Sequence, residues 1–129
     1  MSAPVVVDAS AIVDLLTGSN LAAAVSAGIR GHVLHAPAHL DAEVLSALGR
    51  LHRAGKLSAD DVAERVDRLA AAPLERHELA GLLPGTWRRR HNLRLVDALY
   101  VELAGQLDGR LITTDAGMAA ASPRATLVG

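Results

Sequence analysis

Two aspartates stand directly after short apolar runs that are typical of buried strands. Asp8 follows a Val-Val-Val run at residues 5–7, and Asp115 follows Leu-Ile-Thr-Thr at residues 111–114. Ligands bind at the carboxyl ends of parallel strands, so we expect the two carboxylates to be neighbours at that edge of a sheet. Carboxylates that close repel unless they share a proton or a cation, and hard oxygen donors favour Mg²⁺ or Mn²⁺. For either aspartate alone, the alternative is a simple N-cap of the following helix.

Two further carboxylates lie among the apolar positions of expected amphipathic helices. They are Glu43 and Asp97. A carboxylate at the edge of a buried stripe needs a partner, and a metal shared with the strand-end aspartates would supply one. The alternative is a salt bridge at the rim, from Arg50 to Glu43 and from Arg94 to Asp97. The residues alone leave both interpretations open.

Helical geometry separates the other acids from this group. Asp41 and Glu102 point away from the nearby candidate carboxylates by about 200° and 140° around their helices. Asp108 lies roughly 16 Å further along its axis than Asp97, too far to share an ion. We interpret Asp14 as a solvated helix residue, although it is near enough to the group to support it.

Hydroxyl side chains accompany both strand-end aspartates. Ser10 follows Asp8 by two residues, and Thr113 and Thr114 precede Asp115. A hydroxyl at this spacing could hold the carboxylate in one rotamer or bind a metal-bound water. The alternatives are an N-cap for Ser10 and ordinary strand preference for the two threonines.

The elements that must position these residues alternate between strand and helix. We expect strands at 4–7, 32–35, 74–77, 111–114 and 126–128. We expect helices at 11–16, 20–29, 37–54, 58–72, 95–107 and 116–122, and a helix over 78–91 that Pro84 and Gly85 break. This alternation predicts an α/β fold with a central parallel sheet flanked by helices on both faces, in one domain over 1–129.

Composition narrows the class of protein. The chain has 129 residues, is 50% hydrophobic, and has a formal net charge of −1, which excludes binding to polyanions by bulk charge. The absence of cysteine excludes disulfides, thiolate metal sites and cysteine nucleophiles. Asp8 and Asp14 interrupt the apolar N-terminal stretch, so we expect no signal peptide, no membrane span and a cytoplasmic location.

Four segments together resemble the PIN-domain family, in particular the VapC-type toxins of toxin–antitoxin systems. They begin at residues 5, 40, 95 and 111 and read VVVDASAIV, LDAEVLSAL, LVDALYVELA and LITTD. The resemblance covers nearly the whole chain. It implies a compact α/β domain, an acidic pocket that binds Mg²⁺ or Mn²⁺, endonucleolytic cleavage of single-stranded RNA, inhibition by a cognate VapB-type antitoxin, and a homodimer.

The resemblance also implies roles for individual residues. The family's catalytic and metal-binding acids correspond to Asp8, Glu43, Asp97 and Asp115, and its usual hydroxyl positions to Ser10 and Thr113. The implied chemistry is in-line attack of a metal-activated water on an RNA phosphodiester.

Three positions depart from the family's pattern. Val96 stands where an aromatic residue is frequent, and Met118 where a bulky aromatic residue or Leu is frequent. Both departures concern local packing rather than the metal site. Glu102 replaces a commonly small residue, and we expect it to be exposed.

One dense basic run could contact the RNA. It consists of Trp87, Arg88, Arg89 and Arg90, with Arg94 close behind. The arginines could bind phosphates while the indole stacks on a base. The alternative is a solvated helix face whose tryptophan anchors the core.

Other functions fit the sequence less well. A receiver-type signalling domain needs a lysine after a late strand, whereas the single lysine, Lys56, falls between two helices. The chain has no Gly-x-x-x-x-Gly-Lys run, which excludes a P-loop nucleotide hydrolase. The remaining alternative is a catalytically weak PIN-like module that binds RNA or protein.

Overall fold

A computed structural model describes residues 3–129 and contains one five-stranded sheet. All strand pairs are parallel, and the strand order is β3-β2-β1-β4-β5. The strands are β1 (Val5–Val7), β2 (Leu34–Pro37), β3 (Leu74–His77), β4 (Arg110–Thr113) and β5 (Ala125–Leu127). The predicted α/β class with a parallel central sheet is therefore confirmed.

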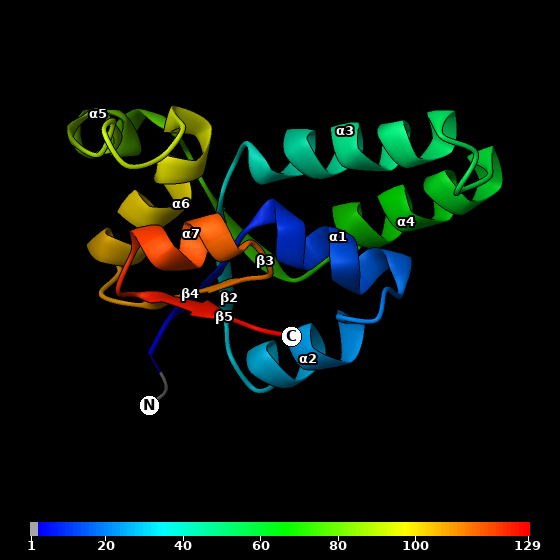
Figure 1. Ribbon diagram of the computed structural model, residues 1–129, viewed down its shortest axis with the longest axis horizontal. Coiled ribbons are helices and arrows are strands. Elements are labelled where there is room, and N and C mark those ends of the chain that lie inside the picture. Colours follow the sequence, from blue (N-terminus) through cyan, green and yellow to red (C-terminus); the bar gives the residue numbers. More distant parts are fainter. Residues whose placement is uncertain (1–2) are drawn as a thin grey trace.

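Helices cover both faces of this sheet (Figure 1). They are α1 (Ala9–Thr17), α2 (Ala22–Ile29), α3 (Leu40–Arg53), α4 (Ala59–Ala71), α5 (Leu83–Arg88), α6 (Leu95–Gln106) and α7 (Ala116–Ala121), with a 3₁₀ turn η1 (Ala80–Leu82) before α5. On one face α6 packs against β1, β2 and β4. On the other, α1 and α2 contact β4, and α3 and α4 pack against α1.

The apolar spacing of the sequence accounts for these layers. The three valines of β1 are completely buried, as expected for a central strand covered on both faces. In α3 the buried residues Leu40, Val44 and Leu48 recur every four positions and form a single stripe. The core of the domain is therefore aliphatic, formed where the helices meet the sheet.

The clearest differences between the expected and the observed elements lie at residues 31–40 and 78–91. The helix expected over 37–54 begins at Leu40, because residues up to Pro37 belong to β2. The second strand occupies residues 34–37 rather than 32–35, because 31–33 form the turn after α2 and Val33 is exposed. The expected helix over 78–91 is η1 followed by α5. The break precedes Pro84, which occupies the first turn of α5, where a missing backbone N–H costs no hydrogen bond.

The chain reverses its direction across the sheet beside β1. It passes from β1 to β2 and β3 on one side and later returns to β4 and β5 on the other. Gly109 lets β4 start close to β1, because a Cβ atom there would lie 2.4 Å from the backbone oxygen of Pro4. The carboxyl ends of β1 and β4 thus border the crevice where sheets of this kind bind ligands.

Within residues 3–129, no single helix is long and apolar enough to cross a bilayer. The α1 and α2 helices meet the length and composition criteria only as a pair, and that pair is bent by 119° at its break.

Candidate active site

Asp8 is the most deeply buried of the four predicted acids. It follows β1, is 2% exposed, and caps the N-terminus of α1 by accepting the Ala11 N–H at 3.0 Å. The Ser10 hydroxyl donates to the same carboxylate oxygen at 2.8 Å, and the Thr113 hydroxyl donates to the other at 2.5 Å. Both predicted hydroxyls therefore hold the Asp8 carboxylate, and the N-cap is Asp8 rather than Ser10.

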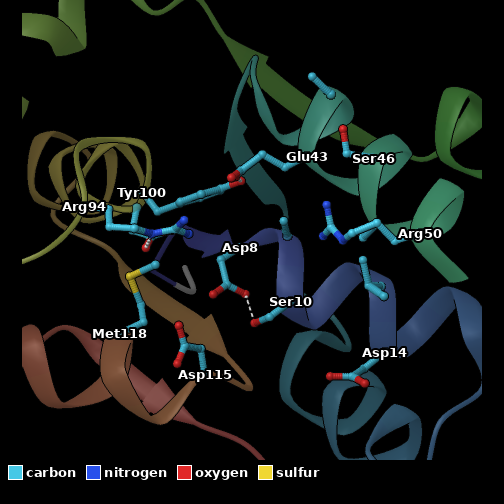
Figure 2. Close-up of a pocket in the computed structure, with 15 residues that line it drawn as sticks. Asp8, Ser10, Asp14, Glu43, Ser46, Arg50, Arg94, Tyr100, Asp115 and Met118 are labelled. Atoms are coloured by element: carbon cyan, nitrogen blue, oxygen red, sulfur yellow. Dashed lines mark hydrogen bonds and ion pairs between the residues drawn. The ribbon is translucent and has the colours of Figure 1, made fainter. Parts of the chain in front are cut away.

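The structure brings the four predicted acids into one pocket. Asp8 precedes α1, Glu43 lies in α3, Asp97 in α6, and Asp115 at the start of α7, and all four line a cavity of about 640 Å³. Figure 2 shows Asp8 in the middle, with Glu43 on one side and Asp115 on the other. Residues up to 107 positions apart in sequence thus meet at the carboxyl edge of the sheet.

Glu43 is positioned by Tyr100, a role that we did not predict. The Tyr100 hydroxyl donates to its carboxylate at 2.6 Å. His39 Nε2 lies 3.4 Å from the same oxygen, but its nearer partner is the backbone oxygen of Val96, at 2.8 Å. The His39 ring packs against Tyr100 with centroids 4.8 Å apart. Arg50, the alternative partner, lines the pocket without a recorded ion pair to Glu43. A signal for Tyr100 was present, since it follows Asp97 by three residues and so shares its helix face.

The partner of Asp97 is an exposed arginine, and the partner of Asp115 is a backbone N–H two residues away. Arg94 binds Asp97 through two contacts, at 3.0 and 3.3 Å, so the alternative salt bridge is also present. The Arg94 side chain is 77% exposed. Because an exposed ion pair contributes little to stability, this contact can open without great cost. Asp115 accepts the Gly117 N–H, so it caps α7 as well as lining the pocket.

Asp14 is not the solvated residue that we expected. It is half-buried, lines the pocket, and accepts hydrogen bonds from Thr114 at 2.7 Å and from Ser19 at 2.8 Å. One turn of α1 separates it from Ser10, so it flanks the acids at one end of the cavity. Thr114 thus serves Asp14 rather than Asp115.

Burial and like charge act together on the groups in this pocket. Burial raises the pKa of Asp8, and the neighbouring Asp115 carboxylate raises it further, whereas the Thr113, Ala11 and Ser10 hydrogen bonds oppose the shift. Burial and the hydrogen bond to Glu43 also raise the pKa of Tyr100, so its phenol keeps its proton and remains a donor. The pocket therefore concentrates negative charge that a cation would neutralise.

The donor set suits a hard divalent cation. The four acids supply only carboxylate oxygens, the ligands that Mg²⁺ and Mn²⁺ prefer. The hydroxyl partners of Asp8 and Glu43 hold these carboxylates from behind, as supporting residues do in metal sites. The residues present therefore fit the predicted ion.

The basic run lies outside this pocket. Arg89 pairs with Glu102 at 3.0 Å, and Arg90 lies over the Trp87 ring at 4.8 Å. Trp87 is 57% exposed and borders an apolar groove between α5 and α6, so the alternative of a core-anchoring tryptophan is wrong. The expectation of an exposed Glu102 is also wrong: its side chain is 12% exposed, because α5 approaches α6 closely at Gly85.

Basic charge enters the pocket from other positions. Arg50 of α3 and Arg94 before α6 both line the cavity with the acids. We predicted Arg94 as a possible ion-pair partner of Asp97 and as part of the basic run, and Arg50 only as a possible partner of Glu43. Their position beside the acids depends on how α3 and α6 pack, which no local pattern specifies.

Comparisons with known proteins agree with the fold. The PIN domain family model matches residues 5–122. Ribonuclease VapC3 of Mycobacterium tuberculosis is 52% identical over 126 residues, covering 97% of this chain and 92% of that protein.

Solved structures show the same fold. Mycobacterium tuberculosis VapC20, described as a Sarcin-Ricin loop cleaving toxin, superposes with a TM-score of 0.69 at 16% identity, covering 92% of this chain and 95% of that one. A toxin–antitoxin complex from Klebsiella pneumoniae gives 0.68 at 18% identity, covering 95% of each chain.

The raised pKa of Asp8 predicts how stability depends on pH without metal. The folded state binds this proton more tightly than the unfolded state, so the contribution of Asp8 to stability falls as pH rises through the raised value. We expect Asp8→Asn in EDTA to melt about 2–6 °C above the wild type at pH 7. This difference in melting temperature should disappear when the pH falls below the ordinary pKa of an aspartate. Thermal denaturation of both proteins at a series of pH values measures the difference.

The same measurement with Mn²⁺ tests the ion. Added Mn²⁺ should raise the melting temperature of the wild type and leave that of Asp8→Asn nearly unchanged. Asp108→Asn is the matched control, because Asp108 is exposed and pairs with Arg124 outside the pocket. An equal response to Mn²⁺ in wild type and Asp8→Asn would contradict the site.

Proposed function

This chain belongs to the PIN-domain family, among relatives named VapC ribonucleases, and from that premise we propose that it is a metal-dependent endoribonuclease. It cleaves single-stranded or loop RNA as the toxin of a VapBC-type toxin–antitoxin pair. The observation that carries the proposal is the convergence of four carboxylates from four separate elements in one pocket.

The acids have distinct parts in this reaction. A bound Mg²⁺ or Mn²⁺ would supply a water of lowered pKa and neutralise the charge that gathers on the phosphate oxygens. Asp8, Asp97 and Asp115 would hold the ion directly or through water. Glu43 would be a further ligand or would position the attacking water.

The residues around the acids keep them ready for this role. Thr113 and Ser10 hold the Asp8 carboxylate in one rotamer, and Tyr100 does the same for Glu43. Arg50 and Arg94 place positive charge in the pocket, where an RNA phosphate would otherwise meet only carboxylates. This arrangement lowers the cost of bringing one anion to a group of others.

The partners follow from the relatives and from the resemblance. We propose inhibition by a cognate VapB-type antitoxin, and a chain of the toxin–antitoxin complex from Klebsiella pneumoniae shares the fold of this chain. We propose a cytoplasmic location as well, where RNA substrates are available. We also propose a homodimer, which sedimentation would detect as twice the 13.4 kDa mass of the chain; a single-chain mass at micromolar concentration would contradict it.

The second candidate function is a catalytically weak PIN-like module that binds RNA or protein. The presence of all four acids in one pocket disfavours it, because a binding module has no need to bear the repulsion among them. A cleavage assay separates the two functions.

RNA cleavage tests the proposed activity directly. The purified protein should cut RNA from a panel of structured and single-stranded substrates only when Mg²⁺ or Mn²⁺ is present. Asp8→Asn should lower the rate more than about 100-fold, since changes behind metal ligands alone cost 10- to 100-fold. Asp108→Asn should cut like the wild type. A wild type that binds Mn²⁺ in the pocket and cuts nothing in the panel would support the binding module.

RNA binding by variants of the basic run tests whether this run contacts RNA. We expect the double variant Arg88→Ala with Arg90→Ala to bind RNA about three- to tenfold more weakly. The slope of log affinity against log salt concentration should fall by the equivalent of roughly one phosphate contact or more. Arg89 is left unchanged, because its removal would take away the ion-pair partner of the half-buried Glu102 carboxylate. Binding is measured in the Asp8→Asn background to prevent cleavage.

The control removes the same charge elsewhere. The double variant Arg53→Ala with Arg110→Ala removes two exposed arginines, one at the far end of α3 and one at the amino end of β4. If both double variants bind RNA alike, the basic run has no part in RNA contact, and Arg50 and Arg94 become the candidates.

A further inference from the structure

Two histidines and a glutamate that are scattered in sequence meet on one face of the sheet. His35 lies in β2, and Glu75 and His77 lie in the adjacent strand β3. His35 is in register with Glu75, and alternate residues of a strand share a face, so all three side chains project to the same side. Each offers one ligand atom, and these three atoms lie within 4.8 Å of one another.

The distances in this group approach those of a metal site. His35 Nδ1 lies 2.9 Å from His77 Nε2 and 3.4 Å from a Glu75 carboxylate oxygen. Tetrahedral Zn²⁺ with ligands at 2.0–2.1 Å keeps neighbouring ligand atoms about 3.3 Å apart. The two nitrogens therefore need to separate by only about half an ångström to admit an ion.

The group is also partly preorganised. His35 is 9% exposed, on a strand with neighbours on both sides, so its ring has little freedom. The ring centroids are 5.2 Å apart, whereas the two nearest nitrogens are 2.9 Å apart, so the rings face each other through their nitrogens. The Glu75 side chain is 64% exposed and can turn to complete the site without disturbing the core.

We propose that His35, Glu75 and His77 form a Zn²⁺ site that joins the edge strand β3 to β2 and is separate from the acidic pocket. Two imidazoles and one carboxylate favour Zn²⁺ over Mg²⁺, which prefers oxygen donors alone. On binding, the ring that donates in the His35–His77 hydrogen bond moves its proton to its other nitrogen, and both facing nitrogens bind the ion. None of the three residues lines the acidic pocket.

A bound Zn²⁺ ion would hold the edge strand β3 against β2. Strand β3 ends the strand order and is held through β2. A bound ion would add a cross-link between residues 35 and 77 in the folded state, which the unfolded chain lacks. Zn²⁺ should therefore stabilise the fold.

The test uses the full chain without a histidine tag, in the Asp8→Asn background and in excess Mg²⁺, so that the acidic pocket takes no part. Calorimetric titration should show one equivalent of Zn²⁺ bound, and saturation should raise the melting temperature by about 5 °C or more. Co²⁺ in place of Zn²⁺ should give the strong visible bands of a tetrahedral site.

Three variants identify the ligands. His77→Gln should abolish binding and the Co²⁺ bands, and Glu75→Gln, at an exposed position, should weaken binding at least about tenfold. His91→Gln, at another exposed histidine, should bind like the parent. Absence of saturable Zn²⁺ binding, or unchanged binding in both His77→Gln and Glu75→Gln, would overturn the proposal.

Discussion

The burial of the Asp8 carboxylate is the constraint on which the rest of the site depends. A buried carboxylate is costly unless several donors satisfy it, and here the donors come from two separate places. Ala11 and Ser10 belong to the first turn of α1, whereas Thr113 belongs to β4. The same hydrogen bonds that make Asp8 tolerable therefore lock the start of α1 to β4, at the point where the strand order reverses.

Each of the other acids is held by its own partner rather than by another acid. Tyr100 holds Glu43, Arg94 holds Asp97, and a backbone N–H of α7 holds Asp115. These partners differ in how firmly they bind: the Tyr100 hydroxyl is buried, while the Arg94 side chain is largely exposed. The pocket thus keeps its shape without a cation, yet its most exposed contact can yield to an ion or a phosphate.

Two sets of possible metal ligands lie in separate parts of the same sheet, one made of carboxylates alone and the other of two imidazoles and a carboxylate. The carboxylates gather at the carboxyl ends of β1 and β4, whereas the histidines and Glu75 lie across β2 and the edge strand β3. Because donor type decides which metal a site prefers, one fold can hold two different ions without competition between them. The first arrangement serves the proposed chemistry, and the second would strengthen an edge that hydrogen bonds hold from one side.

The sequence by itself determined the α/β class and singled out the four acids and the hydroxyls at positions 10 and 113 as candidates, because strand-end acids and helical periodicity are local signals. For Glu43 and Asp97 the residues alone left a salt bridge at the rim open, and the resemblance to the PIN-domain family assigned them to the metal site. The sequence did not determine that Tyr100 would position Glu43, that Asp14 would be half-buried, or that Glu102 would be covered by α5. It also gave no reason to pair His35 with His77. Each of these contacts joins residues from different elements or depends on how elements pack, and only the tertiary structure decides which side chains meet across such distances in sequence.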